Sequence, residues 1–329
     1  MNVCGIDTGY KTLDLVIRKK GNSLKCKSFA NTPSGHIEIL NYLRKHKVKR
    51  VGVEATGYYH LDIAIELDDA TEIEVMIINP RASKNFAKAL MTKLKNDAID
   101  AEVIAKFVER MDFVIWQSPD HDVFALRSCG RRLISLTKEK TKAKNQLHAF
   151  SLTKRMPNFI IDDIKLTIEQ LENQINSIID HALLIIKESD DLLSRYKLIT
   201  SMKGVADKTA IKLLGELGVL DFDMSGKQWV AHAGLFPREF QSGSSVNKRT
   251  SIGKIGNRYI REALYMGALS ASSHEPHVRA FYHHLINDNG LTKLQAICAV
   301  MRKMLLAIHG MLKTDKSFCG KRFYTIETC

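Results

Sequence analysis

Proline, tryptophan and paired cysteines are scarce in this sequence. The 329 residues include six prolines, two tryptophans and six cysteines. No two cysteines form a Cys-x-x-Cys pair, which argues against both a disulfide framework and a zinc knuckle, so we expect reduced thiols. A chain of this length predicts two or three domains.

Long apolar runs and targeting signals are also missing. No apolar run approaches the roughly 20 residues that cross a bilayer, and residues 1–20 lack the basic start, apolar stretch and cleavage site of a secretory signal. A Gly-rich phosphate loop of the P-loop kind does not occur. We therefore expect a cytoplasmic location, no membrane partner and no ATP requirement.

Acidic residues are outnumbered by basic ones. The chain has 49 Lys and Arg against 36 Asp and Glu, a net charge of +13 and a pI near 9.4. Such a balance favours a polyanionic partner, because Lys and Arg displace the counterions condensed on nucleic acid. Charge alone leaves open a basic protein that binds no nucleic acid.

The first 118 residues alternate strand-like and helix-like patterns. Two extended runs, NVCGIDTG and TLDLVIRK, precede a helical stretch near residues 34–46, and the apolar strands RVGVEATG and IEVMIINP follow. This order predicts an α/β domain that resembles the start of a ribonuclease H-like sheet, although periodicity alone permits other α/β folds. Residues 80–110 lack strand alternation and are predicted to be helical.

Residues 119–197 have the pattern of long helices. Apolar residues recur at steps of three and four on both sides of Met156 and Pro157, which predicts an antiparallel helical hairpin that turns there. A coiled-coil oligomerisation arm and ordinary packing of two helices within one subunit both fit this pattern. Lysines 138, 140, 142 and 144 are expected to form a solvated or phosphate-facing surface.

Residues 198–314 are predicted to form a mainly α-helical third domain, followed by a loose tail over 315–329. Short helical patterns lie between glycine-rich breaks. SMKGVADKTAIKLLGELG suggests a helix-hairpin-helix, in which Gly204 and Thr209 would hold a phosphate at a helix N-terminus. Packing of two helices around a turn is the equal alternative.

Four carboxylates have a pattern that suggests metal binding. Asp7 and Glu54 interrupt apolar strands, and Asp97 and Asp100 share one face at the head of a predicted helix. If the four converge, they would raise each other's pKa unless a divalent cation neutralised them, and oxygen donors suit Mg²⁺ or Mn²⁺. Phosphodiester chemistry is the natural use of such a metal site. Taken singly, Asp97 and Asp100 are better explained as surface charges or as charges that the helix dipole stabilises at a helix N-terminus.

A serine in a basic segment is a second candidate. Ser242 precedes Gly243 in an expected flexible loop, and cations nearby in sequence would orient a phosphate and stabilise its developing charge. On composition alone Ser242 does not differ from Ser244, Ser245 or Ser251. The candidate phosphate-binding cations are Arg238, Lys248, Arg249, Lys254, Arg258 and Arg261.

Several motifs occur together in a known order. GIDTGYKTLDLVI, VGVEATGYYHLDIAIEL, INPRASKNFAKAL and KLKNDAIDAEVIAKF precede AGLFPREFQSGSSVNKRTSIGKIGNRYIREALYM. From Val3 to about Met311 the chain resembles the DEDD transposases of insertion sequences, a family that includes the pilin-gene invertases. Thr8-Gly9-Tyr10 and Asn96 depart from the common pattern without touching a proposed ligand.

The resemblance implies a fold, an activity and a set of site residues. It implies a RuvC-like domain whose metal ligands are Asp7, Glu54, Asp97 and Asp100, and a C-terminal domain whose nucleophile is Ser242. It also implies homo-oligomers, DNA as substrate and a structured guide RNA encoded by the element. Two alternatives remain: a RuvC-like junction nuclease that hydrolyses DNA with metal and water, and a non-catalytic nucleic-acid-binding protein.

Overall fold

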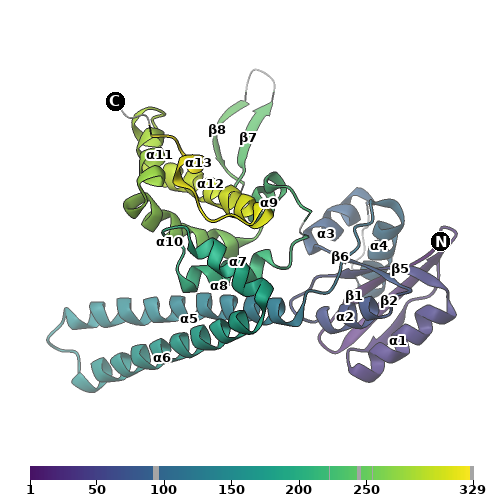
Figure 1. Cartoon of the computed structure of the whole chain (residues 1–329). Coiled ribbons are helices and arrows are strands. Elements are labelled where there is room, and N and C mark those ends of the chain that lie inside the picture. The colour runs from purple at the N-terminus through teal and green to yellow at the C-terminus, as the bar shows by residue number, and fades with distance from the viewer. Residues whose placement is uncertain (92–95, 222, 243–245, 254, 327–329) are drawn as a thin grey trace. The chain divides into compact units, whose positions relative to one another are not determined.

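A computed structural model describes residues 1–91, 96–221, 223–242, 246–253 and 255–326. The chain divides into two compact units, Met1–Ser118 and Pro119–Cys329. Each unit has its own hydrophobic core. Figure 1 shows the helices and strands of both units.

The first unit is built on a mixed β-sheet. Strand β1 pairs antiparallel with β2 and parallel with β5, which in turn pairs parallel with β6. The resulting order is β3-β2-β1-β5-β6, and β4 also pairs with β2. This is the sheet expected of a ribonuclease H-like fold. The strands are β1 (Asn2–Thr8), β2 (Thr12–Lys19), β3 (Asn22–Ser23), β4 (Lys27–Ala30), β5 (Val48–Glu54) and β6 (Glu74–Ile78).

Helices cover both faces of this sheet because its strands alternate apolar side chains on the two sides. Helices α1 and α2 pack on one face through residues such as Leu43 and Ile63. Helices α3 and α4 pack on the other through residues such as Phe86 and Ile104 (Figure 1). The four helices are α1 (Pro33–Lys45), α2 (Leu61–Asp69), α3 (Pro80–Ala89) and α4 (Asp97–Arg110).

The second unit begins with two long helices, α5 (His121–Ser151) and α6 (Asn158–Glu188). They run side by side in opposite directions (Figure 1), which confirms a helical hairpin. The coiled-coil oligomerisation arm stays a prediction. Three of the four lysines expected to face solvent or phosphate make ion pairs within the unit: Lys140 and Lys144 with Glu172, and Lys138 with Glu262.

The rest of the second unit is mainly helical around one apolar core. Helix α12 is long and apolar enough to cross a membrane by length and composition, and it buries residues such as Val300 and Leu305 in that core. The remaining elements are α7 (Asp190–Thr200), α8 (Asp207–Leu217), α9 (Gly226–Ala233), β7 (Pro237–Ser242), β8 (Val246–Ile252), α10 (Arg258–His274), α11 (Pro276–Asn287), α12 (Lys293–Thr314) and α13 (Gly320–Phe323).

One expectation for this unit is wrong, and one glycine gains a structural explanation. Residues 316–326 do not form a loose tail, because Phe323 is buried and the Nδ1 of His277 bonds the carbonyl oxygen of Tyr324 at 2.7 Å. Gly204 lies between α7 and α8 at φ +97°, and a Cβ there would overlap the carbonyl oxygen of Gly267 in α10. This close approach is a packing reason for the glycine, and the phosphate-binding role of Gly204 and Thr209 stays a prediction.

Candidate active site

Asp7 and Glu54 lie on neighbouring strands, on the same face of the sheet. Strand β1 carries Asp7 two residues after Gly5, and β5 carries Glu54 two residues after Gly52. Gly5 and Gly52 are register partners across the parallel pair β1·β5. Because side chains alternate along a strand, both carboxylates face the same way as the two glycines.

The two glycines let α4 approach the sheet closely. A Cβ on Gly5 would overlap the backbone of Ala101 and Ala105, and a Cβ on Gly52 would overlap the side chain of Val108. All three overlapped residues belong to α4. The absence of a side chain at both positions therefore places α4 directly on the face that carries Asp7 and Glu54.

The first turn of α4 supplies the other two carboxylates. Asn96 caps the helix, since its side-chain oxygen accepts a hydrogen bond from the backbone N–H of Ile99 at 2.9 Å. Asp97 and Asp100 follow in the first turn, where the helix dipole stabilises negative charge. The start of α4 and the ends of β1 and β5 thus bring all four predicted carboxylates to one region of the first unit.

Asp7 responds electrostatically to the other three. Burial first, and then the negative charges of Glu54, Asp100 and Asp97 in that order, raise its pKa to about 6, against a lowering by a hydrogen bond from the backbone of Thr8. Carboxylates that raise the pKa of a neighbouring carboxyl group in this way are expected where a cation binds. The four predicted ligands therefore share one electrostatic environment.

The donor chemistry fits a hard divalent cation, because all four groups offer carboxylate oxygens. Their spacing is looser than that of a formed metal site. Within the described part of the chain, no three His, Cys, Asp or Glu side chains lie close enough together to hold one ion. Ligation would require these side chains to draw closer than they stand here.

Asp14 is a further acidic residue at this place, and it was not predicted from the sequence. It is the register partner of Asp7 across the antiparallel pair β1·β2. The pKa of the nearby Cys26 thiol is raised by burial and then by the charge of Asp14. An aspartate inside the apolar run TLDLVI was the available signal, the same one that pointed to Asp7 and Glu54.

Ser242 lies in the second unit and ends strand β7. Its backbone pairs with Val246 of β8, so it belongs to a β-hairpin and not to the flexible loop that the sequence suggested. Gly243, Ser244, Ser245 and Lys254 lie outside the described residues. Arg238 also belongs to β7, and Lys248 and Arg249 belong to β8.

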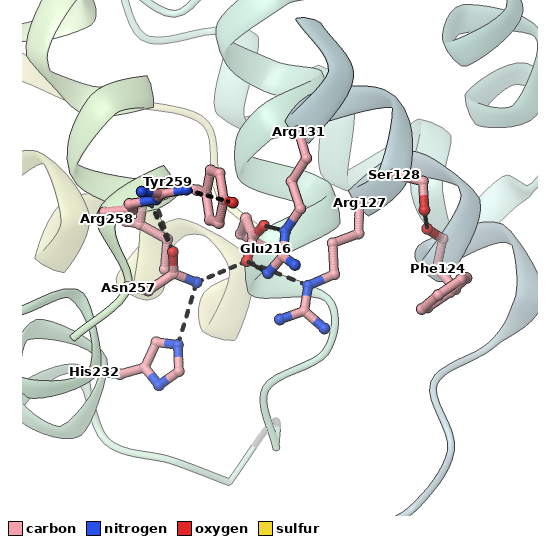
Figure 2. A network of polar contacts seen from close by, with 10 residues as sticks. Phe124, Arg127, Ser128, Arg131, Glu216, His232, Asn257, Arg258 and Tyr259 are labelled. Atoms are coloured by element: carbon pink, nitrogen blue, oxygen red, sulfur yellow. Dashed lines mark hydrogen bonds and ion pairs between the residues drawn. The ribbon is translucent and has the colours of Figure 1, made fainter. Parts of the chain in front are cut away.

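A buried carboxylate organises the surroundings of α10 (Figure 2). Glu216 of α8 has a side chain only 3% exposed. It accepts hydrogen bonds from Arg131 Nε at 2.6 Å, Arg127 Nε at 3.3 Å and Asn257 Nδ2 at 2.7 Å. Burial raises the pKa of Glu216, but the bond from Arg131, the charge of Arg127 and the bond from Asn257 outweigh it and leave the pKa lowered.

Asn257 connects this network to the basic residues of α10. Its side-chain oxygen caps the helix by accepting from the backbone N–H of Tyr259 at 2.9 Å. Arg258 is exposed and lies over the Tyr259 ring at 4.9 Å. Arg261 is half-buried, and its Nη1 donates to the carbonyl oxygen of Ala233 at 2.8 Å. Arg258 therefore suits contact with a phosphate better than Arg261, which already has a structural role.

Segments in both units are similar to known transposases. A family model described as "Transposase" matches residues 4–157, and one described as "Transposase IS116/IS110/IS902 family" matches residues 196–283. The pilin gene-inverting protein of Moraxella lacunata is 28% identical over 95% of this chain and 96% of its own length. The transposase for insertion sequence element IS1328 of Yersinia enterocolitica is 25% identical over 80% of this chain and 82% of its own.

A solved structure also resembles part of the chain. Thermus thermophilus RuvC in complex with a Holliday junction substrate matches 34% of this chain and 96% of its own, with 19% sequence identity and a TM-score of 0.27.

These matches define the class of the protein as an enzyme of DNA transposition and recombination. Within that class, residues 196–283 are similar to the transposases of the IS116/IS110/IS902 family. Nuclease domains with this carboxylate set require a divalent metal in general.

Proposed function

We propose that this transposase cleaves and exchanges DNA strands to move an insertion sequence, with Ser242 as nucleophile and with Mg²⁺ or Mn²⁺ held by Asp7, Glu54, Asp97 and Asp100. The observation that carries the metal part is the raised pKa of Asp7, which the other three carboxylates help to cause. A divalent cation would remove this repulsion and draw the ligands together.

The reaction balances without ATP. The Oγ of Ser242 would attack phosphorus and lose its proton, while the phosphodiester bond to the departing strand breaks and that strand's hydroxyl takes up a proton. The hydroxyl of a second strand would then attack the phosphoserine and return the proton to Ser242. A bound metal would act as Lewis acid and stabilise charge on the phosphoryl oxygens.

Basic residues would hold the DNA backbone near the serine. We assign this role to Arg238, Lys248, Arg249, Lys254, Arg258 and Arg261, which follow Ser242 or precede it closely in sequence. Arg258 has the best support because it is exposed at a capped helix N-terminus. Arg261 would act mainly by fixing the end of α9 beside it.

The partners belong to the same proposal. We propose that the enzyme works in the cytoplasm as a homo-oligomer, with a structured RNA from the element as guide. The basic balance of the chain supports a nucleic-acid partner of either kind. RNA recovered with the purified protein and sequenced should be enriched in the flanks of the element, and a random set of fragments would contradict guiding.

A plasmid recombination assay tests the catalytic part. Asp7→Ala, Glu54→Ala, Asp97→Ala and Asp100→Ala should each abolish cleavage and joining in Mg²⁺ while the folded protein persists. Asp69→Asn, an exposed change at the end of α2, is the matched control and should keep activity. Recombination at the normal level by the Asp7 variant would refute the metal assignment.

A junction nuclease is the second candidate, since a carboxylate cluster alone suffices for hydrolysis by a metal-activated water. It differs in its products, because hydrolysis leaves nicked DNA and no strand exchange. The matches to transposases and to an invertase along the chain favour recombination.

A further inference from the structure

Three tyrosines beside the carboxylates are exposed. Tyr10 follows Asp7 by three residues in the turn between β1 and β2, and Tyr58 and Tyr59 follow Glu54 in the segment between β5 and α2. Their exposed fractions are 70%, 58% and 45%. A large aromatic side chain of a globular domain is ordinarily more buried than this, so these rings do not serve as core.

The exposed rings lie against each other. Tyr10 and Tyr59 have ring centroids 5.6 Å apart at an interplanar angle of 61°. In such an edge-to-face pair, at least one ring keeps both of its faces uncovered by the other. The pair therefore offers a flat aromatic face to solvent at the end of the strands that carry Asp7 and Glu54.

The two segments that carry the rings are fixed to each other. The side-chain amide of Asn31 donates to the carbonyl oxygens of Gly9 and Tyr59, both at 3.0 Å. The backbone N–H of Asn31 donates to the carbonyl oxygen of Lys11 at 2.9 Å. His36 Nε2 bonds the side-chain oxygen of Asn31 at 2.8 Å and so orients the amide.

Part-buried hydrogen bonds of Asn31 thus hold the segments that carry the exposed rings. His36 is buried, and burial lowers its pKa against the raising effect of Asp62 and Glu66. The rings themselves gain little from the core. Their fixed position implies a ligand that binds to an aromatic face.

We propose that Tyr10 and Tyr59, with Tyr58 at their edge, form a stacking platform for one unpaired nucleobase of the DNA strand that is cut at the carboxylate cluster. This inference rests on the proposed function, because it takes the reacting phosphate to lie beside Asp7 and Glu54. Nucleobases stack on aromatic side chains whatever their sequence.

Electrostatics explains why stacking suits this place. Asp7, Glu54, Asp97 and Asp100 repel a phosphodiester until a metal is bound. Stacking on a neutral tyrosine does not depend on the sign of nearby charge. The platform can therefore hold DNA at a carboxylate site before the metal neutralises it.

Base pairing decides which DNA fits. In a duplex each base is stacked on both faces by its neighbours, so a ring can stack only on a base that has left the helix. The platform thus selects an unpaired or splayed nucleotide next to the cut phosphate. Such nucleotides arise where strands separate for exchange.

Fluorescence of 2-aminopurine tests this directly. The probe base is placed in a short bubble within a duplex of the element's end, and binding is followed in EDTA so that cleavage plays no part. Wild-type protein should quench the probe. Tyr10→Leu and Tyr59→Leu should lose most of the quenching and bind the bubble roughly tenfold more weakly, as removal of one stacking partner predicts.

Controls separate stacking from other effects. Tyr10→Phe and Tyr59→Phe keep a ring and should behave as wild type. Tyr265→Leu changes a 39% exposed tyrosine of α10 and should also leave quenching unchanged. Since the rings are exposed, the leucine variants should melt at the wild-type temperature and bind fully paired duplex with unchanged affinity.

Each other outcome has a defined meaning. Leucine variants that quench like wild type, or that lose duplex and bubble binding equally, would overturn the platform. Quenching of an RNA probe alone would overturn the assignment to DNA. If wild-type protein bound neither bubble nor duplex, the proposed function itself would fail, whatever the tyrosines do.

Discussion

At the scale of single residues, an acidic side chain in an apolar strand is the strongest signal in this sequence. Asp7 and Glu54 could be selected from the sequence, because a buried carboxylate destabilises the fold and is kept only where it is paired or has a function. Their convergence with Asp97 and Asp100 could not be derived, because it depends on how closely α4 packs on the sheet. Asp14 carried the same signal and was missed, since nothing in the sequence fixes which strand residues lie opposite each other.

The pKa of Asp7 gives a prediction for stability. Its folded value of about 6 exceeds the ordinary 3.8. The stability that it contributes is therefore full below pH about 4 and is lost as pH rises through about 6. In metal-free protein at neutral pH, Asp7→Asn should raise the free energy of unfolding by about 1 to 2 kcal/mol, a figure reduced for partial exposure.

Thermal melts with and without Mg²⁺ measure this effect. Mg²⁺ should raise the melting temperature of wild type at neutral pH and much less at pH about 4, where Asp7 is largely protonated. Asp7→Asn should respond weakly at both. If Asp7→Asn were less stable than wild type in EDTA, repulsion from the other carboxylates would not destabilise the protein at Asp7.

At the scale of secondary structure, the sequence predicted the elements better than their contacts. The helical hairpin and the strands of the first unit were expected from periodicity. The ion pairs of Lys138, Lys140 and Lys144 were not, because their acidic partners lie on other helices. The strand that ends at Ser242 was taken for a loop because serine and glycine follow each other there.

Helix α4 gives a prediction about the glycines beneath it. Gly5→Ala would force the Cβ against the backbone of α4 and push Asp97 and Asp100 away from Asp7. We expect a loss of about 1 to 3 kcal/mol in stability together with loss of the Mg²⁺-dependent rise in melting temperature. Gly310→Ala is the control, because no atom other than those of its own helix backbone and its chain neighbours lies within 4 Å of its Cβ position. Retention of the full Mg²⁺ response by Gly5→Ala would contradict this account of α4.

Glu216 gives a prediction for the helices around α10. Glu216→Ala leaves Arg127 and Arg131 without this partner in a half-buried place and should destabilise the second unit by about 3 kcal/mol. Because the pKa of Glu216 is lowered, the stability it contributes is present above pH about 4.5 and is lost as pH falls through its folded value. Acid denaturation curves should show a smaller pH dependence for Glu216→Gln than for wild type. Identical curves would show that the negative charge of Glu216 does not stabilise the fold.

At the scale of the whole molecule, two units carry two kinds of chemistry. Carboxylates that suit a divalent metal lie in Met1–Ser118, and the candidate nucleophile lies in Pro119–Cys329. The family resemblance linked them from the sequence, because both sets of motifs occur in one order along one chain. The residues of the first unit alone would predict only a nuclease, and those of the second unit alone would predict only a basic hairpin.

The central claim is that Ser242 attacks phosphorus, and trapping of a covalent intermediate tests it most directly. A nicked substrate that prevents resealing is incubated with protein and Mg²⁺, and the products are resolved under denaturing conditions. Ser244→Ala and Ser245→Ala serve as matched controls in the same segment and should keep at least part of the activity. Wild type should give a protease-sensitive protein–DNA species whose phosphoserine maps to Ser242 by mass spectrometry, and Ser242→Ala should bind DNA yet give no adduct and no recombinant. Recombination by Ser242→Ala, or an adduct at another residue, would contradict the serine mechanism.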